Sequence, residues 1–169
     1  MESHFFATLS RMKYIERWAL MRNARPENLS EHALEVAMIA HALCVIGNVR
    51  YGKQLNGEKA ALIALYHDAS EIITGDMPTP VKYANGRIRS AYKEVEAGAE
   101  ERLLAQLPED LRPAFAGIFR EENAAGKEAE NERYMRRLVK AADTLSALIK
   151  CTEEQAAGNS EFRTAAAST

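Results

Sequence analysis

The apolar residues of this chain recur with helical spacing, and no stretch alternates apolar and polar residues as a half-buried strand does. Alanine is abundant, and the Asn-Gly pairs that begin at residues 56 and 85 are better interpreted as turns between helices than as hairpin turns. These features predict an all-α fold. Because a chain of 169 residues favours one compact domain, we expect a single helical bundle over residues 1–169.

Capping residues and prolines divide the chain into successive helices. Ser30 is a good N-cap, Gly47 provides a stop, and two prolines within three residues exclude residues 75–80 from a helix interior. Residues 18–28 are predicted to form a loop, and the tail at 163–169 has little to bury, so we expect it to be frayed. The predicted helices cover residues 3–14, 30–46, 56–73, 88–107, 109–122 and 128–158.

Net charge, cysteine content and the length of apolar runs indicate which binding partners and which compartment to expect. The net charge of −2 gives no general reason to expect binding to nucleic acid or to a membrane. Cys44 and Cys151 lie in apolar helical stretches, with no second cysteine at metal-binding spacing, so they are predicted to be reduced core thiols. The apolar runs are short for a membrane span, and residues 1–10 lack the layout of a signal peptide, so we expect a cytoplasmic protein.

His67 and Asp68 follow an apolar helical run, residues 60–66. A buried carboxylate without a partner is costly in free energy, so Asp68 needs a cation or a hydrogen-bond donor nearby. On this dipeptide alone, a His-Asp pair that simply leaves the helix for solvent is an equally good interpretation.

Two further polar residues lie at the edge of apolar helical stripes. His32 is in the first turn of the second predicted helix, and Asp143 is an isolated acid in the last long helix. Three helices would thus bring two imidazoles and two carboxylates to the centre of the bundle, where such sites form. This ligand set suits one divalent ion of the Mn, Co, Fe, Zn or Cu type. The alternative is that these residues only pair with one another.

Glu71 lies four residues after His67, one helical turn further along the same predicted helix. A carboxylate there can accept a proton from water or deliver one to a leaving oxygen, although a surface position near a helix end is an alternative. His41, nine residues after His32, falls on the opposite side of its helix and is interpreted as a packing or surface histidine.

The order His32, His67-Asp68, Asp143, with spacings of 35 and 75 residues, resembles the HD-domain phosphohydrolase superfamily. The resemblance is closer to one branch, the bacterial 5′-deoxynucleotidases of the YfbR type, and it covers nearly the whole chain. Members of that branch continue for a few dozen residues beyond the equivalent of Phe162, so this chain is shorter than the family pattern. The blocks that carry the resemblance are residues 3–6, 17–23, 28–32, 66–71, 74–83, 140–143, 151, 153–154 and 157–162.

The resemblance implies a homodimeric enzyme that uses a divalent metal ion to hydrolyse deoxyribonucleoside 5′-monophosphates to deoxyribonucleosides and phosphate. It implies that Asp68 and Glu71 are catalytic. The planar guanidinium group of an arginine can donate two hydrogen bonds to a phosphate at once. Arg22 and Lys82 are weaker candidates for phosphate binding. The residues that the resemblance places at the nucleotide are Arg17, Trp18, Asp76, Met77, Pro78 and Thr79.

Two other functions stay open. Another HD-type hydrolase, acting on deoxynucleoside triphosphates, (p)ppGpp or cyclic nucleotides, would call for more clustered Lys and Arg residues or for further histidines near the site. A non-catalytic nucleotide-binding HD module would call for a lost metal ligand or a lost Glu71, and all five residues are present.

Overall fold

The computed structural model describes residues 4–120 and 126–169, and its regular elements there are all helical. An isolated antiparallel bridge joins Glu16 to Asn28 across the loop between them. The elements are α1 (Phe5–Leu9), the 3₁₀ helix η1 (Ser10–Tyr14), α2 (Leu29–Tyr51), α3 (Gly57–Tyr66), α4 (Glu71–Thr74), α5 (Thr79–Lys82), α6 (Gly86–Ala105), α7 (Arg112–Phe119), α8 (Gly126–Ala156), the 3₁₀ helix η2 (Ser160–Phe162) and α9 (Arg163–Ser168).

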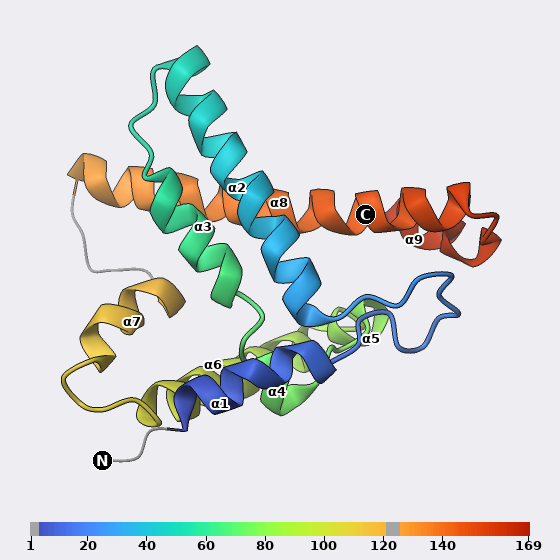
Figure 1. Ribbon diagram of the computed structural model, residues 1–169, viewed down its shortest axis with the longest axis horizontal. Coiled ribbons are helices and arrows are strands. Elements are labelled where there is room, and N and C mark those ends of the chain that lie inside the picture. The colour runs from blue at the N-terminus through green and yellow to red at the C-terminus, as the bar shows by residue number, and fades with distance from the viewer. Residues whose placement is uncertain (1–3, 121–125) are drawn as a thin grey trace.

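The main core lies where α2 and α3 pack together and cross the long helix α8 (Figure 1). Small and β-branched side chains of α2, among them Val36 and Ala40, meet Ile63 of α3 and Val139 of α8. A second cluster joins α1 to α6 through Phe5, with the partly buried α7 against it. The all-α fold predicted from the helical spacing is thus confirmed.

Helix α2 covers Leu29–Tyr51, so it begins earlier and ends later than the predicted range of 30–46. Asn28, and not Ser30, is the N-cap, and it forms a capping box with Glu31. The helix passes through Gly47 and ends at Gly52, which has the left-handed φ of 61°. Gly47 therefore does not end the helix. Its role is in packing, because a Cβ at this position would lie 3.2 Å from a methyl group of Leu55.

The helix predicted over 56–73 is interrupted. α3 ends at Tyr66, residues 67–70 form a turn, and α4 is a separate short helix. Packing explains the break, because Ala69 in the turn is fully buried against the cluster formed by α1 and α6. The loop predicted over 75–80 is shorter than expected, because Pro80 already lies in the first turn of α5. Proline is tolerated there, since its missing N–H group would have no partner within the helix.

The remaining boundaries differ modestly from the prediction. The helix expected over 3–14, whose first residue lies outside the described range, divides into α1 and η1 where the Ser10 hydroxyl donates to the Ala7 carbonyl. The helices expected over 88–107 and 128–158 are α6 and α8. That over 109–122 is the shorter α7, with the last two residues outside the described part.

The tail is helical where the sequence favoured fraying. Residues 163–168 form α9, directly after η2. Phe162 at the end of η2 is fully buried, with its ring centroid 5.4 Å from that of Trp18. This aromatic contact ties the end of the chain to the loop that precedes α2.

By length and composition alone, helix α2 could also cross a membrane. This differs from the expectation from the sequence, in which the apolar runs are short for a membrane span. The core helix of a soluble protein passes the same test. α2 packs against both α3 and α8, and it carries the buried polar residue His32.

The capping box of α2 should be measurable in the stability of the fold. The Asn28 side chain accepts hydrogen bonds from the backbone N–H groups of Ser30 and Glu31 at 3.0 and 3.1 Å. We expect Asn28→Ala to lower the free energy of unfolding by about 1 kcal/mol, and Asn28→Ser to leave it nearly unchanged. Urea unfolding at neutral pH measures both variants, and equal midpoints for wild type and Asn28→Ala would contradict the role of the cap.

Candidate metal centre and active site

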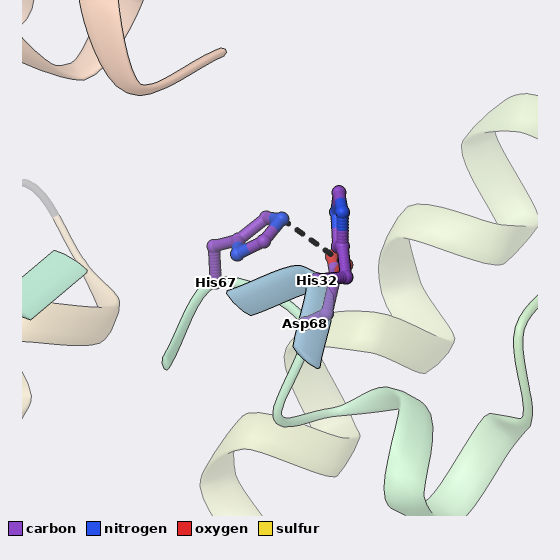
Figure 2. A group of neighbouring side chains, drawn as sticks. All are labelled: His32, His67 and Asp68. Atoms are coloured by element: carbon purple, nitrogen blue, oxygen red, sulfur yellow. Dashed lines mark ion pairs between the residues drawn. The ribbon is translucent and has the colours of Figure 1, made fainter. Parts of the chain in front are cut away.

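Three segments that are distant in sequence bring four ionisable side chains together. His32 comes from the first turn of α2, His67 and Asp68 from the turn after α3, and Asp143 from the middle of α8. Figure 2 shows His32, His67 and Asp68 converging, and one ligand atom from each lies within 4.8 Å of the other two. Asp143 completes the group, with its Oδ1 atom 3.1 Å from His32 Nε2 and 3.9 Å from His67 Nε2.

Asp68 lies between the two imidazoles. Its Oδ2 atom is 3.1 Å from His67 Nε2 and 3.5 Å from His32 Nε2. The two rings are inclined to each other, with their centroids 5.3 Å apart. Both histidines therefore turn the same ring nitrogen, Nε2, toward the carboxylates.

Hydrogen bonds on the far side of each ring fix this orientation. His67 Nδ1 lies 2.7 Å from the carbonyl oxygen of Ala64, which can only accept, so the proton belongs on Nδ1. His32 Nδ1 lies 3.1 Å from the hydroxyl of Ser146. The sequence pattern indicates the four ligand candidates but not Ser146, for which the spacing of three residues from Asp143 is the available indication.

The electrostatics of the cluster favour a cation between the four side chains. Burial alone would raise the pKa of Asp143, but the hydrogen bond from His32 and the neighbouring imidazole of His67 hold it well below its usual range. Burial would likewise lower the pKa of His67, but the neighbouring Asp68 and Asp143 raise it to about 10. In the absence of a metal ion the carboxylates thus keep a proton on this imidazole.

The chemistry of the four residues fits a divalent ion. His67 Nε2 is buried and has no hydrogen bond of acceptable geometry with any described residue, which leaves a nitrogen lone pair for a metal. Two imidazole nitrogens and two carboxylate oxygens form a ligand set used by divalent transition metals, zinc included. Binding would release the proton from His67 and replace its charge with that of the ion.

Glu71 is the first residue of α4 and only 7% exposed. Its Oε2 atom is buried without a hydrogen-bond partner among the described residues. Burial, together with the negative charges of Asp68 and Asp76, raises the pKa of Glu71 to about 9. The sequence placed Glu71 one turn along a continuous helix, whereas the chain reaches this position through the 67–70 turn.

The loop before α2 places Arg17 and Trp18 beside a carboxylate that the sequence analysis missed. Glu27 Oε2 accepts from Arg17 Nη1 at 2.7 Å and from Trp18 Nε1 at 3.0 Å. Trp18 has a φ of 59°, which is unfavourable for a residue with a side chain. Asp76 stabilises this conformation, because its Oδ2 atom accepts from the Trp18 backbone N–H at 3.2 Å.

A buried ion pair on α8 anchors the same loop. Glu154, 2% exposed, accepts hydrogen bonds from the backbone N–H groups of Ala24 and Arg25 at 2.7 and 3.1 Å. Lys150 donates to Glu154 and to the Arg25 carbonyl, while Asn159 donates to Glu154 at 2.8 Å. These contacts hold the loop that carries Arg17 and Trp18 against the C-terminal end of α8. They could not be predicted from the sequence, because on the loop side they involve backbone groups.

The other residues predicted at the nucleotide are less tightly placed. Asp76, Met77 and Pro78 are half-buried in the segment between α4 and α5, and Thr79 is exposed at the start of α5. Burial raises the pKa of Asp76, while the charge of Arg17 and the Trp18 N–H oppose the rise. Only Asp76 of these four is therefore tied by a hydrogen bond to the Arg17 loop.

The weaker candidates lie at the margin. Arg22 is exposed, and Lys82 forms an ion pair of 2.7 Å with Glu96 while its charge still acts on Glu71. His41 is exposed on α2, as expected from its place opposite His32.

Comparison with known proteins agrees with this centre. Residues 4–169 match the 5′-deoxynucleotidase YfbR-like family. The chain belongs to this family. It is 54% identical over 164 residues to the 5′-deoxynucleotidase YfbR of Salmonella typhi, an alignment that covers 97% of this chain and 79% of the relative. The corresponding enzyme of Salmonella newport is 54% identical over 161 residues, 95% of this chain and 77% of the relative.

Solved structures share the fold. An HD-domain phosphohydrolase from Listeria innocua superposes with a TM-score of 0.77 at 24% identity, over 96% of this chain and 76% of that one. The HD phosphohydrolase DatZ of cyanophage S-2L superposes with a TM-score of 0.58 at 26% identity, over 86% of this chain and 69% of that one. That structure contains dA and one catalytic Zn²⁺ ion.

These findings confirm the predicted family, the HD-type fold and the class of activity. The chain is a 5′-deoxynucleotidase of the HD phosphohydrolase type, and hence a phosphoric monoester hydrolase.

The Lys150–Glu154 anchor should make stability depend on pH. The hydrogen bonds lower the pKa of Glu154 from its usual 4.5 to about 2, against the effect of burial. A lowered pKa stabilises the folded state above pH 4.5, and this contribution disappears as the pH falls toward 2. We expect Glu154→Gln to lose about 3 kcal/mol at pH 7 and clearly less at pH 3, as measured by urea unfolding.

The control for this experiment is Glu153→Gln, which makes the same substitution at the exposed neighbouring position. It should unfold like the wild type at both pH values. A loss of stability in Glu154→Gln that is the same at pH 7 and pH 3 would contradict the ionic role of Glu154.

Proposed function

We propose that His32, His67, Asp68 and Asp143 bind one divalent metal ion, and that the enzyme hydrolyses deoxyribonucleoside 5′-monophosphates to deoxyribonucleosides and phosphate. The observation that carries this proposal is the convergence of two Nε2 atoms and two carboxylates beside the buried Glu71, whose Oε2 atom has no hydrogen-bond partner among the described residues. The family of the chain and the single zinc ion in the DatZ structure support it.

The metal ion, which the ligand set allows to be Mn, Co, Fe, Zn or Cu, would activate water and neutralise charge on the phosphate. The role of the chain's own residues is to hold the phosphate and move protons. Asp68 serves twice in this scheme, because it is a ligand and its charge also helps to raise the pKa of Glu71.

Glu71 is proposed to be the proton carrier. Its carboxyl group is buried, and the charges of Asp68 and Asp76 keep its affinity for protons high. A cation at the four ligands would offset part of that negative charge and bring the pKa of Glu71 down, toward the range in which a group can both take and give a proton at neutral pH. It would accept a proton from the attacking water and deliver one to the departing sugar oxygen.

Arg17 and Trp18 are proposed to orient the phosphate. Glu27 engages one terminal nitrogen of the Arg17 guanidinium group, and the group lies over the Trp18 ring at 5.5 Å. An arginine held in this way donates to phosphate oxygens without losing much side-chain entropy. Asp76 is proposed to accept from a sugar hydroxyl, and Met77, Pro78 and Thr79 to contact the nucleotide, with selection against ribose through close packing at the 2′ carbon.

The first experiment is phosphate release from dAMP and AMP by the Co²⁺-loaded or Mn²⁺-loaded protein. We expect release from dAMP, much less from AMP, and none from either after chelation of the metal. Glu71→Gln should bind the metal as the wild type does and release phosphate from dAMP roughly 10²–10⁴-fold more slowly, because it cannot transfer the proton.

The matched control is Glu58→Gln on the exposed face of α3, which should retain full activity. Equal release from dAMP and AMP would remove the sugar selectivity but keep the phosphomonoesterase. A metal-loaded protein that releases phosphate from dATP or cyclic AMP and not from dAMP would overturn the proposed substrate.

We also propose that the enzyme is a homodimer that works in the cytoplasm. An exposed apolar stripe runs along α2, formed by Leu34, Met38, Val45 and Val49, which are 55, 60, 42 and 78% exposed. A second copy of the chain covering this stripe would remove it from water, which accounts for the apolar outer face of α2. Two unpaired cysteine thiols fit a reducing compartment.

The dimer is tested by placing charges in the stripe. We expect light scattering after size exclusion to give twice the chain mass for the wild type and the single mass for Met38→Glu/Val49→Glu, since buried unpaired carboxylates are costly. Val95→Glu, at a half-exposed position on α6, should stay dimeric. A monomeric wild type would contradict the proposal.

A further inference from the structure

A serine hydroxyl and a glutamate lie behind the His32 imidazole, on the side away from the other ligands. The Ser146 hydroxyl is 3.1 Å from His32 Nδ1 and donates to Glu35 Oε2 at 2.5 Å. Ser146 is fully buried, three residues after Asp143 on α8, and Glu35 is three residues after His32 on α2. The two helices that supply ligands therefore also supply this chain of contacts.

The direction of the hydrogen bonds determines where the protons are. An ionised glutamate can only accept, so the Ser146 hydroxyl proton points at Glu35. The hydroxyl oxygen then has only lone pairs to offer His32, so Nδ1 must carry the proton. When the ring is neutral, the lone pair of His32 is therefore on Nε2, the atom that faces Asp68 and Asp143. The Ala64 carbonyl has the same effect on His67.

We propose that Ser146 and Glu35 are positioning residues of the metal centre, which hold His32 in the tautomer and orientation that present Nε2 to a divalent ion. This inference rests on the proposed metal site and extends it to two residues that touch neither ion nor substrate. Glu35 also places a negative charge behind the imidazole, which strengthens its donation to the ion.

Desolvation explains why a serine hydroxyl, and not a carboxylate, contacts His32 Nδ1 directly. Glu35 is half-buried at a cavity of about 150 Å³ that is also lined by Arg25 and Lys150. Its charge stays partly solvated there, whereas a carboxylate at the fully buried position of Ser146, against His32 Nδ1, would lose its hydration at a large desolvation cost. The hydroxyl links Glu35 to the imidazole without placing a charge at that buried position.

The test compares zinc affinity in wild type and Ser146→Ala by competition with a chromophoric chelator. We expect Ser146→Ala to bind Zn²⁺ about 10–100-fold more weakly, the range found when a partner behind a histidine ligand is removed. Thr152→Ala is the matched control, because the exposed hydroxyl of Thr152 on the same helix donates to the Leu148 carbonyl and, within the described part of the chain, lies in no contact with the metal centre. It should bind Zn²⁺ as the wild type does.

A second readout separates positioning from general stability. In the Zn²⁺-loaded wild type, the Nδ1–H proton of His32 should give a slowly exchanging NMR signal, since Ser146 holds it in the interior. The signal should exchange faster or vanish in Ser146→Ala, while that of His67, held by Ala64, persists. Merely structural damage would affect both histidines.

Glu35→Gln provides the variant for the case in which Ser146→Ala does not fold. Glutamine keeps an acceptor oxygen but loses the charge, so we expect a zinc affinity reduced by less than in Ser146→Ala. Wild-type zinc affinity in both Ser146→Ala and Glu35→Gln would overturn the proposal while leaving the metal site intact. A wild type that does not bind Zn²⁺ would instead overturn the metal site itself.

Discussion

Two carboxylates and two imidazoles in contact inside a helical bundle are the constraint on which the rest of this structure depends. Without a cation, Asp68 and Asp143 stabilise a proton on His67, whose pKa rises to about 10. The negative charges of these two carboxylates favour a divalent ion over the proton, because the ion would bring more positive charge to the same place. The main core of α2, α3 and α8 places these groups, so the helices that pack the core also position the proposed ligands.

The helical class and the convergence of the four candidate ligands could be predicted, because the local sequence pattern indicates each of them. His32, Asp68 and Asp143 are polar residues at the margin of apolar stripes, which is costly unless they meet a partner. The break after α3 could not be predicted, because it results from burial of Ala69 against α1 and α6. Local propensity contains no information on such distant packing.

Glu27, Ser146 and Glu154 escaped the sequence analysis for a related reason. Each acts through backbone groups or through another side chain, and each has a partner between 9 and 130 residues away in the chain. Glutamates and serines are common on helix surfaces, so their type alone indicates nothing. Only the fold shows that Glu154 is 2% exposed and that Ser146 is fully buried.

The polar contacts divide into two groups with different tasks. The first, built on Glu154 and Lys150, fixes the loop that carries Arg17 and Trp18, the residues proposed to orient a phosphate. The second, built on Ser146 and Glu35, fixes the ring of His32, a proposed ligand of the metal ion. Both groups include residues of α8, with Ser146 and Lys150 four residues apart. Because α8 is one continuous helix over this span, its backbone sets the spacing between the anchored loop and the His32 ring, and under the proposed function it would thereby set the relative position of phosphate and ion.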